Sequence, residues 1–406
     1  MSKKKLKSWA SRTASIAQLG AGLGAEIVEV VDRMHGSISR MPSPVGKIDD
    51  ERARGISGFV YRCVKGGFEM GHGGLRMLAK ELAKHDDDDP AWLQVRAATN
   101  GVCGDLLLER DNPMAQSMVF VREQAAPTAS NDNEPKTLLL FIHGLCTSDL
   151  AWHDGVHDIV TAKLAETLNA RVAYLRYNSG RHISENGEEL AHLLETHCAD
   201  DQRIVIIGHS MGGLLARSAT HYANKNQLQW PDKFSHLVAL GSPHNGAPAE
   251  RLGNMANTIL MASPYTNPLS RLGNFRSAGI RDLRFSNLMH EDWENIENQD
   301  HQEDLRTNLV PLNANTQYLF VAGTRSETLT DNPLDAKHDL LVTVESAWAM
   351  GDRPEFVLDG DNISRVILPA TDHLRLMWSC EVYDEIEGWF ADLGTLTTDL
   401  AESNQE

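Results

Sequence analysis

The chain has 406 residues, of which 41% are hydrophobic and 23% charged, an ordinary composition for a folded protein with a large core. Its formal net charge of -18 speaks against nucleic-acid binding, because phosphate backbones are bound by clustered Lys and Arg. The five cysteines are widely spaced, odd in number and form no CxxC pair. The sequence therefore predicts reduced thiols, with neither a disulfide framework nor a zinc site. The five cysteines are Cys63, Cys103, Cys146, Cys198 and Cys380.

The N-terminus is basic. Lys3, Lys4, Lys5 and Lys7 resemble the start of a signal peptide, but residues 9–31 contain no sustained apolar run. No segment reaches the roughly 18 apolar residues of a transmembrane helix, so the sequence predicts a cytoplasmic protein. A solvated tail is the preferred interpretation of this basic start, and a weak peripheral contact of an amphipathic start with anionic lipid is the alternative.

The first third of the chain has the spacing of helices. Apolar residues recur at intervals of three and four within residues 16–31, 60–68 and 75–82. The acidic run at 86–89 before Pro90 predicts a loop followed by a helix start. We expect a helical N-terminal region over residues 1–112.

From about residue 117, short apolar runs alternate with amphipathic helical stretches, and this alternation predicts a doubly wound, mostly parallel sheet. Several runs are apolar throughout, as expected of parallel strands buried on both faces. The predicted strands cover residues 118–122, 137–142, 171–177, 203–208, 236–241, 317–323 and 365–368. The predicted helices cover residues 158–168, 188–196, 212–223 and 380–393. We assign residues 113–398 to this domain and 399–406 to a tail.

A candidate nucleophile follows the fourth predicted strand. Residues 208–213 read GHSMGG, so a GxSxG motif lies between a buried strand and a helix. The turn is tight enough to require Gly208 and Gly212, and it would lift the Ser210 hydroxyl above the sheet edge at the positive end of the helix. An ordinary strand–turn–helix connection is the structural alternative. We predict Ser210 as a nucleophile.

A serine nucleophile needs a base and an orienting carboxylate, which follow it in that order after an elbow of this kind. Asp331, Asp335 and Asp339 all lie after the predicted strand 317–323. His373 is the one histidine after Asp339, and it directly follows the last predicted strand. We predict His373 as the base.

Two backbone N–H groups would stabilise the oxyanion. We expect Met211, directly after the nucleophile, and Leu145, in the turn after strand 137–142, to provide them. His143 is expected to support that turn rather than to bind a metal, and Gly144 and His209 are expected beside the site.

Several segments together resemble bacterial serine lipases and GPI-inositol-deacylase-like α/β hydrolases, over roughly residues 115–395. The resemblance implies an α/β-hydrolase fold. The family's acid lies in a D-G-L-V type motif, which corresponds to Asp339, and its base lies in an N/D-H-L motif, which corresponds to His373. On this ground Asp339 is preferred over Asp331 and Asp335. The segments are FIHGL at 141–145, GHSMGG at 208–213, GSPHNGAP at 241–248, DLLV at 339–342 and ESA at 345–347.

The sequence departs from this family at two positions near the site. Residue 340 is Leu where the family commonly has Gly, which predicts a differently shaped acid loop. Related lipases hold calcium with an Asp two residues past the base, and Arg375 at that position predicts no calcium site. We expect no metal and no cofactor. The small lipases have no counterpart of the helical first third.

Residues 249–311 interrupt the alternating pattern. The first part is apolar and rich in Met, and residues 281–304 are strongly charged. We expect this insertion to form a cap or lid that contacts an acyl chain, because Met side chains adapt to irregular surfaces. A helical insert packed on the core is the alternative.

These features predict a serine esterase or lipase that acts on a small-molecule ester or a lipid. A thioesterase or an acyltransferase would use the same three residues. A catalytically silent scaffold, with the helical first third as its interaction region, is the alternative outside enzymes. The oligomeric state stays open.

Overall fold

The computed structural model describes residues 90–124, 135–152, 155–199, 201–248, 277–296, 303–336 and 338–393. Several predictions lie outside these residues: the helical patterns before residue 86, the basic N-terminus, the Met-rich start of the insertion and the tail. These stay predictions.

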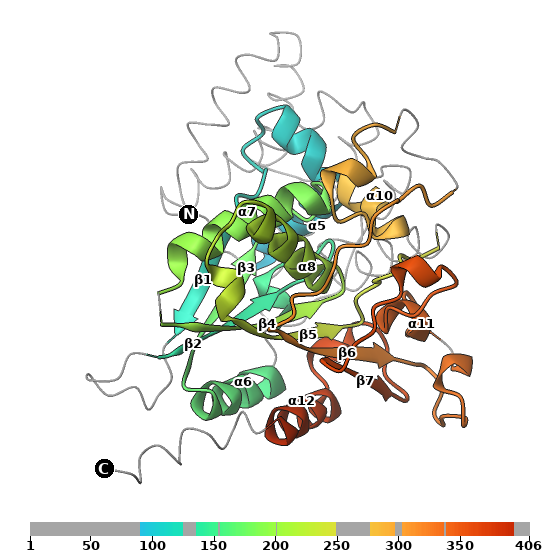
Figure 1. Cartoon of the computed structure of the whole chain (residues 1–406). Coiled ribbons are helices and arrows are strands. Elements are labelled where there is room, and N and C mark those ends of the chain that lie inside the picture. The colour runs from blue at the N-terminus through green and yellow to red at the C-terminus, as the bar shows by residue number, and fades with distance from the viewer. Residues whose placement is uncertain are drawn as a thin grey trace, which may run out of the picture.

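Seven strands form one sheet in the order β1-β3-β2-β4-β5-β6-β7 (Figure 1). β1 pairs with β3 in antiparallel orientation, and every other neighbouring pair is parallel. The predicted doubly wound, mostly parallel sheet is confirmed. The strands are β1 (Val119–Gln124), β2 (Thr137–Ile142), β3 (Ala170–Arg176), β4 (Arg203–His209), β5 (Phe234–Leu240), β6 (Gln317–Gly323) and β7 (Ile363–Leu368).

Helices cover both faces of the sheet. One face carries α5 (Pro90–Glu109), α7 (Ile183–His197), α8 (Met211–Lys225) and α10 (Ala278–Phe285), and the other carries α6 (Gly155–Thr167) and α12 (Cys380–Asp392) (Figure 1). The short helix α11 (Val344–Ala347) follows the acid loop. Single 3-10 turns complete the described elements: Asp149–Trp152, Trp230–Lys233, His290–Asp292, Pro333–Asp335, Pro354–Phe356 and Arg375–Met377.

The alternation of side chains along β2 explains these two layers. Leu138, Leu140 and Ile142 join the core beneath α7 and α8, whereas Leu139 and Phe141 join the core beneath α6 and α12. All five side chains are fully buried. An apolar run without polar interruption is therefore what a central strand between two helical layers requires.

Several element boundaries differ by a few residues from the sequence prediction, and the structure gives a reason for two of them. α7 begins at Ile183 rather than near residue 188, because Asp282 of α10 accepts the Ile183 N–H at 2.8 Å and caps the helix from a distant segment. β5 ends at Leu240, because Gly241 takes a φ of 59° and turns the chain.

Pro90, the first described residue, already belongs to helix α5, and the acidic run before it lies outside the described residues, so the predicted helix start stays a prediction. Trp92, Val95 and Leu107 of this helix are buried in the same core as β2, α7 and α8. The described end of the N-terminal third is thus part of the body of the sheet domain. The division at residue 112 stays a prediction.

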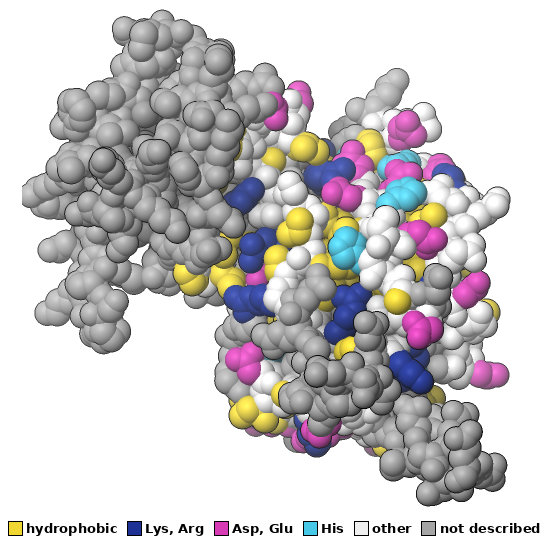
Figure 2. Space-filling model, turned by 90° about the vertical axis from the view of Figure 1, so that its left-hand side faces the viewer, with side chains coloured by type: hydrophobic (Ala, Val, Ile, Leu, Met, Phe, Trp, Pro, Cys, Tyr) yellow, Lys and Arg dark blue, Asp and Glu magenta, His cyan; other side chains and the backbone are white. Residues whose placement is uncertain are grey.

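Within the described residues, no helix is both long and apolar enough to cross a membrane. On the face shown in Figure 2, the described Lys, Arg, Asp and Glu side chains are interspersed among hydrophobic and neutral ones. The cytoplasmic location stays a prediction.

Candidate active site

Ser210 occupies a strained turn between β4 and α8. Its backbone has φ 55° and ψ -120°, a region that residues other than Gly rarely adopt. The turn is compact, since a Cβ on Gly208 would lie 2.5 Å from the Gly213 nitrogen and one on Gly212 would lie 2.3 Å from the Ile142 oxygen. Ser210 is 1% exposed, and its Oγ has no hydrogen-bond partner among the described residues.

His373 follows β7 and is held by Asp339, which follows β6. The His373 Nδ1 lies 2.7 Å from Asp339 Oδ2, and the His373 N–H donates to the Asp339 carbonyl at 2.9 Å. Both side chains are 1% exposed. A proton on Nδ1 donates to the carboxylate and leaves Nε2 as an acceptor, and this Nε2 has no partner among the described residues.

The other oxygen of the Asp339 carboxylate is fixed by the backbone. Asp339 Oδ1 accepts the N–H groups of Leu341 at 2.9 Å and Val342 at 2.7 Å. Of the three candidate carboxylates, Asp339 is the one that is hydrogen-bonded to His373, whereas Asp331 and Asp335 are exposed.

Leu340, where the family commonly has Gly, takes a φ of 97°. The backbone at this position of the acid loop therefore has a positive φ, which Gly adopts freely and which is strained for Leu.

The turn after β2 lies against Ser210. A Cβ on Gly144 would be 3.0 Å from the Ser210 Cβ. Leu145 is fully buried in this turn, and Met211 is the first residue of α8. The Cys146 N–H donates to Ser179 Oγ at 3.1 Å, so this neighbouring amide is already engaged.

Two buried histidines, His143 and His209, form hydrogen bonds beside Ser210 and His373. His143 Nδ1 donates to the Gly144 carbonyl at 2.8 Å, and its ring stacks on Tyr177 with centroids 4.4 Å apart. His209 Nε2 donates to the His373 carbonyl at 2.9 Å. Burial lowers the pKa of His143 to about 4, and burial together with the nearby His373 holds the pKa of His209 well below 6.5. Both imidazoles are therefore neutral near neutral pH.

Cys146 is the thiol beside the turn. Burial raises its pKa to about 12, so the thiol is protonated near neutral pH and is a poor nucleophile. The four cysteines that the structure describes form no disulfide.

Tyr177 and Ser179 were not found by sequence reasoning, and Gly241 was singled out only as the start of the GSPHNGAP segment, without a place beside His373. A Cβ on Gly241 would lie 3.2 Å from His373 Nδ1, so the loop after β5 passes directly against the His373 ring. Tyr177 donates its hydroxyl to the His143 carbonyl at 2.9 Å, and Ser179 holds Cys146. Apart from the GSPHNGAP segment, the signal in the sequence is the position of these residues just after strands of a parallel sheet, where sites of this fold class gather.

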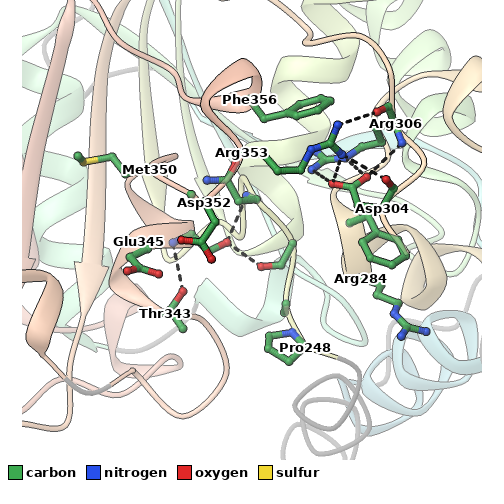
Figure 3. Close-up of a pocket in the computed structure, with 16 residues that line it drawn as sticks. Pro248, Arg284, Asp304, Arg306, Thr343, Glu345, Met350, Asp352, Arg353 and Phe356 are labelled. Atoms are coloured by element: carbon green, nitrogen blue, oxygen red, sulfur yellow. Dashed lines mark hydrogen bonds and ion pairs between the residues drawn. The ribbon is translucent and has the colours of Figure 1, made fainter. Parts of the chain in front are cut away.

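A cavity of ≈ 390 Å³ lies beyond the acid loop, between the end of α10 and the start of α11 (Figure 3). Arg306 and Arg353 both face the Phe356 ring, at 4.3 and 4.4 Å from its centroid, and both pair with Asp304. The residues that line it do not include Ser210, Asp339 or His373. Among the described residues, no group of His, Cys, Asp and Glu could hold a metal ion. The absence of a metal site and of a cofactor stays a prediction.

The sheet order, the strand–elbow–helix turn and the His–Asp pair at its edge define an α/β hydrolase. More particularly, the chain belongs to the PGAP1-like alpha/beta domain family, whose model matches residues 137–383.

Comparison with other known proteins gives only distant similarities. No curated protein matches the chain. The mature Bacillus licheniformis lipase BlEst2 is 17% identical over 67% of this chain and 97% of its own, with a TM-score of 0.42. Alpha/beta hydrolase domain-containing protein 10 from mouse is 12% identical over 68% and 94%, with a TM-score of 0.40. The Pyrococcus furiosus esterase Pf2001 is 15% identical over 70% and 90%, with a TM-score of 0.36.

Proposed function

We propose that this hydrolase cleaves carboxylic esters of small molecules or lipids through an acyl-enzyme on Ser210. One observation carries the proposal: the buried Ser210 Oγ and His373 Nε2 both lack partners among the described residues, while the other side of the imidazole is fixed by Asp339. Unpaired buried polar atoms are costly, and a substrate that hydrogen-bonds to both atoms would remove this cost.

In the proposed mechanism, His373 Nε2 takes the proton of Ser210 Oγ as the oxygen attacks the ester carbonyl carbon. The N–H groups of Leu145 and Met211 stabilise the oxyanion, and Asp339 stabilises the imidazolium. The C–O bond to the alcohol then breaks, and His373 Nε2 returns the proton to the leaving oxygen. Water, activated by the same nitrogen, releases the acid from Ser210.

The test is hydrolysis of p-nitrophenyl esters from acetyl to palmitoyl, with labelling by a fluorophosphonate and mapping of the labelled peptide. We expect turnover and a label on Ser210 in the wild type, and in Ser210→Ala no label and a kcat lower by about 10⁴-fold or more. Ser286→Ala is the matched control, because Ser286 is also buried, has φ 60° and has an unpaired Oγ among the described residues.

Ser210→Ala with undiminished ester hydrolysis would contradict the proposal. A labelled Ser210 without ester turnover would favour a thioester substrate or acyl transfer, which added acyl-CoA and alcohols would reveal. Neither label nor turnover would favour a scaffold.

A further inference from the structure

We infer that helix α5 positions the oxyanion turn, with Gly101 and Ser179 as positioning residues. This inference rests on the proposed function, because it concerns the N–H donors of Leu145 and Met211. It gives the described end of the N-terminal third a role in the chemistry.

The backbone of α5 touches the turn at Gly101. A Cβ on Gly101 would lie 2.4 Å from Cys146 Sγ, 2.6 Å from its Cα and 2.7 Å from its nitrogen. Two of these three atoms are backbone, so a rotamer change of Cys146 cannot make room. Cys146 has φ 58°, and it directly follows Leu145. The path of the turn at the proposed donor is therefore set by contact with α5.

A second segment, the loop after β3, links α5 to the same turn. Ser179 Oγ accepts the Cys146 N–H at 3.1 Å. A Cβ on Gly180 would lie 2.0 Å from the Asn100 carbonyl oxygen of α5, and Asn178 donates its side-chain amide to the Gly104 carbonyl at 2.9 Å. The residue that holds the turn is thus itself fixed against α5.

A third segment, the start of α10, extends this contact to Met211. Ser277 Oγ donates to the Gly101 carbonyl at 2.6 Å, and the Gly279 N–H donates to the Gly180 carbonyl at 3.1 Å. A Cβ on Gly279 would lie 2.2 Å from the Ser179 carbonyl oxygen and 3.2 Å from Met211 Cε. Cys146, the residue after the proposed donor Leu145, and the side chain of Met211, the other proposed donor, therefore both lie against these three segments.

Oxyanion stabilisation is sensitive to such positioning, because loss of one donor typically lowers kcat by about 10²–10³-fold. A methyl group at Gly101 cannot fit without moving α5 or the turn. We expect Gly101→Ala to lower kcat about 10- to 100-fold with little change in KM, because the donors act mainly in the transition state. Ser179→Ala, which removes one hydrogen bond and adds no bulk, is expected to lower kcat about 10-fold.

The experiment compares both variants with the wild type on one p-nitrophenyl ester. Affinity for a trifluoromethyl ketone, which forms a hemiketal oxyanion on the serine, is measured in parallel with the melting temperature. Affinity for the ketone should fall in proportion to kcat. Gly388→Ala in α12 is the matched control, since a Cβ there meets nothing within 4 Å, and it should leave kcat and ketone affinity unchanged.

The outcomes separate this inference from the proposed function. Folded Gly101→Ala and Ser179→Ala proteins with wild-type kcat and ketone affinity would overturn the inference alone, provided that Ser210→Ala is inactive. If Gly101→Ala does not fold, Ser179→Ala decides. A wild type that neither hydrolyses the ester nor binds the ketone would overturn both.

Discussion

Leu340 concentrates strain in the acid loop. Its φ of 97° is unfavourable for a residue with a Cβ, and such a conformation costs about 1–3 kcal/mol. The loop holds it because the next two N–H groups are bound to Asp339 Oδ1 and its own N–H donates to His338 Nδ1 at 3.0 Å. The strain is thus balanced by the hydrogen bonds that fix the carboxylate.

At most positions Ala gives a more stable protein than Gly, and at residue 340 we expect the opposite. We expect Leu340→Gly to be more stable than Leu340→Ala by about 1 kcal/mol, because Gly adopts positive φ without strain. Ala is the right comparison, since both variants remove the Leu side chain. Urea unfolding of the two variants measures the difference, and a less stable Gly variant would show that the loop is not strained at residue 340.

The charge of the Asp339 carboxylate should matter for catalysis, and Asp339→Asn, which keeps the size of the side chain, tests this. Asp339→Asn keeps an oxygen for the Leu341 and Val342 N–H groups, but it would favour the wrong tautomer of His373. We expect kcat to fall by about 10⁴-fold with KM little changed. The exposed Asp335 provides the control, and Asp335→Asn should hydrolyse p-nitrophenyl esters at the wild-type rate. Equal activity of the two variants would remove Asp339 from the mechanism.

At the scale of elements, α5 belongs energetically to the sheet domain. Trp92, Val95 and Leu107 are at most 7% exposed, and each large apolar side chain of this kind contributes about 1.5–3 kcal/mol by burial. The net stability of a domain is about 5–15 kcal/mol, so the loss of this one helix is decisive.

A chain that starts at residue 111 should therefore fail to fold. We expect no cooperative thermal transition by circular dichroism and exposure of the core surface beneath α5. The comparison is a chain that starts at residue 90, which keeps every described contact of α5. Cooperative melting of the shorter chain would show that the sheet domain is independent of this helix.

For the whole molecule, buried histidines couple stability to pH. Burial lowers the pKa of His143 and of His236 to about 4, and it holds the pKa values of His209 and His244 well below 6.5. The folded state thus binds protons at these sites less readily than the unfolded state. Their contribution to stability is complete above pH 6.5 and is lost as the pH falls toward the folded values.

We expect the melting temperature to fall steeply below about pH 6.5. Protonation of His143 and of His236 in the unfolded state should each lower the free energy of unfolding by about 2 kcal/mol between neutral pH and about pH 5. His236 lies beside the Trp389 and Phe390 rings. His236→Phe should lower the number of protons taken up on unfolding by about one, and so make the free energy of unfolding less dependent on pH. His192→Gln is the control, because His192 is exposed. A melting temperature that does not change between neutral and mildly acidic buffer would contradict this account.

The sequence by itself determined the strands, the alternation that makes the sheet parallel and the elbow at Ser210. These follow from local signals: apolar runs long enough for a buried strand, and glycines at fixed spacing around a serine. Chain order also selected His373, whereas the choice of Asp339 among three aspartates needed a family resemblance. The hydrogen bond to His373 then distinguished Asp339 in the structure.

The tertiary structure alone decided which distant segments complete the site. Gly101 and Ser179 carry no periodicity or motif that links them to Ser210, and Gly241, although it begins the GSPHNGAP segment, carries none that places it against His373. Each acts through backbone contact or one hydrogen bond with a residue more than 30 positions away. Such contacts depend on how helices and loops pack on the sheet, and packing joins residues whose local sequences are independent of each other. For this reason the sequence predicted the candidate residues, and only the fold revealed what holds them in place.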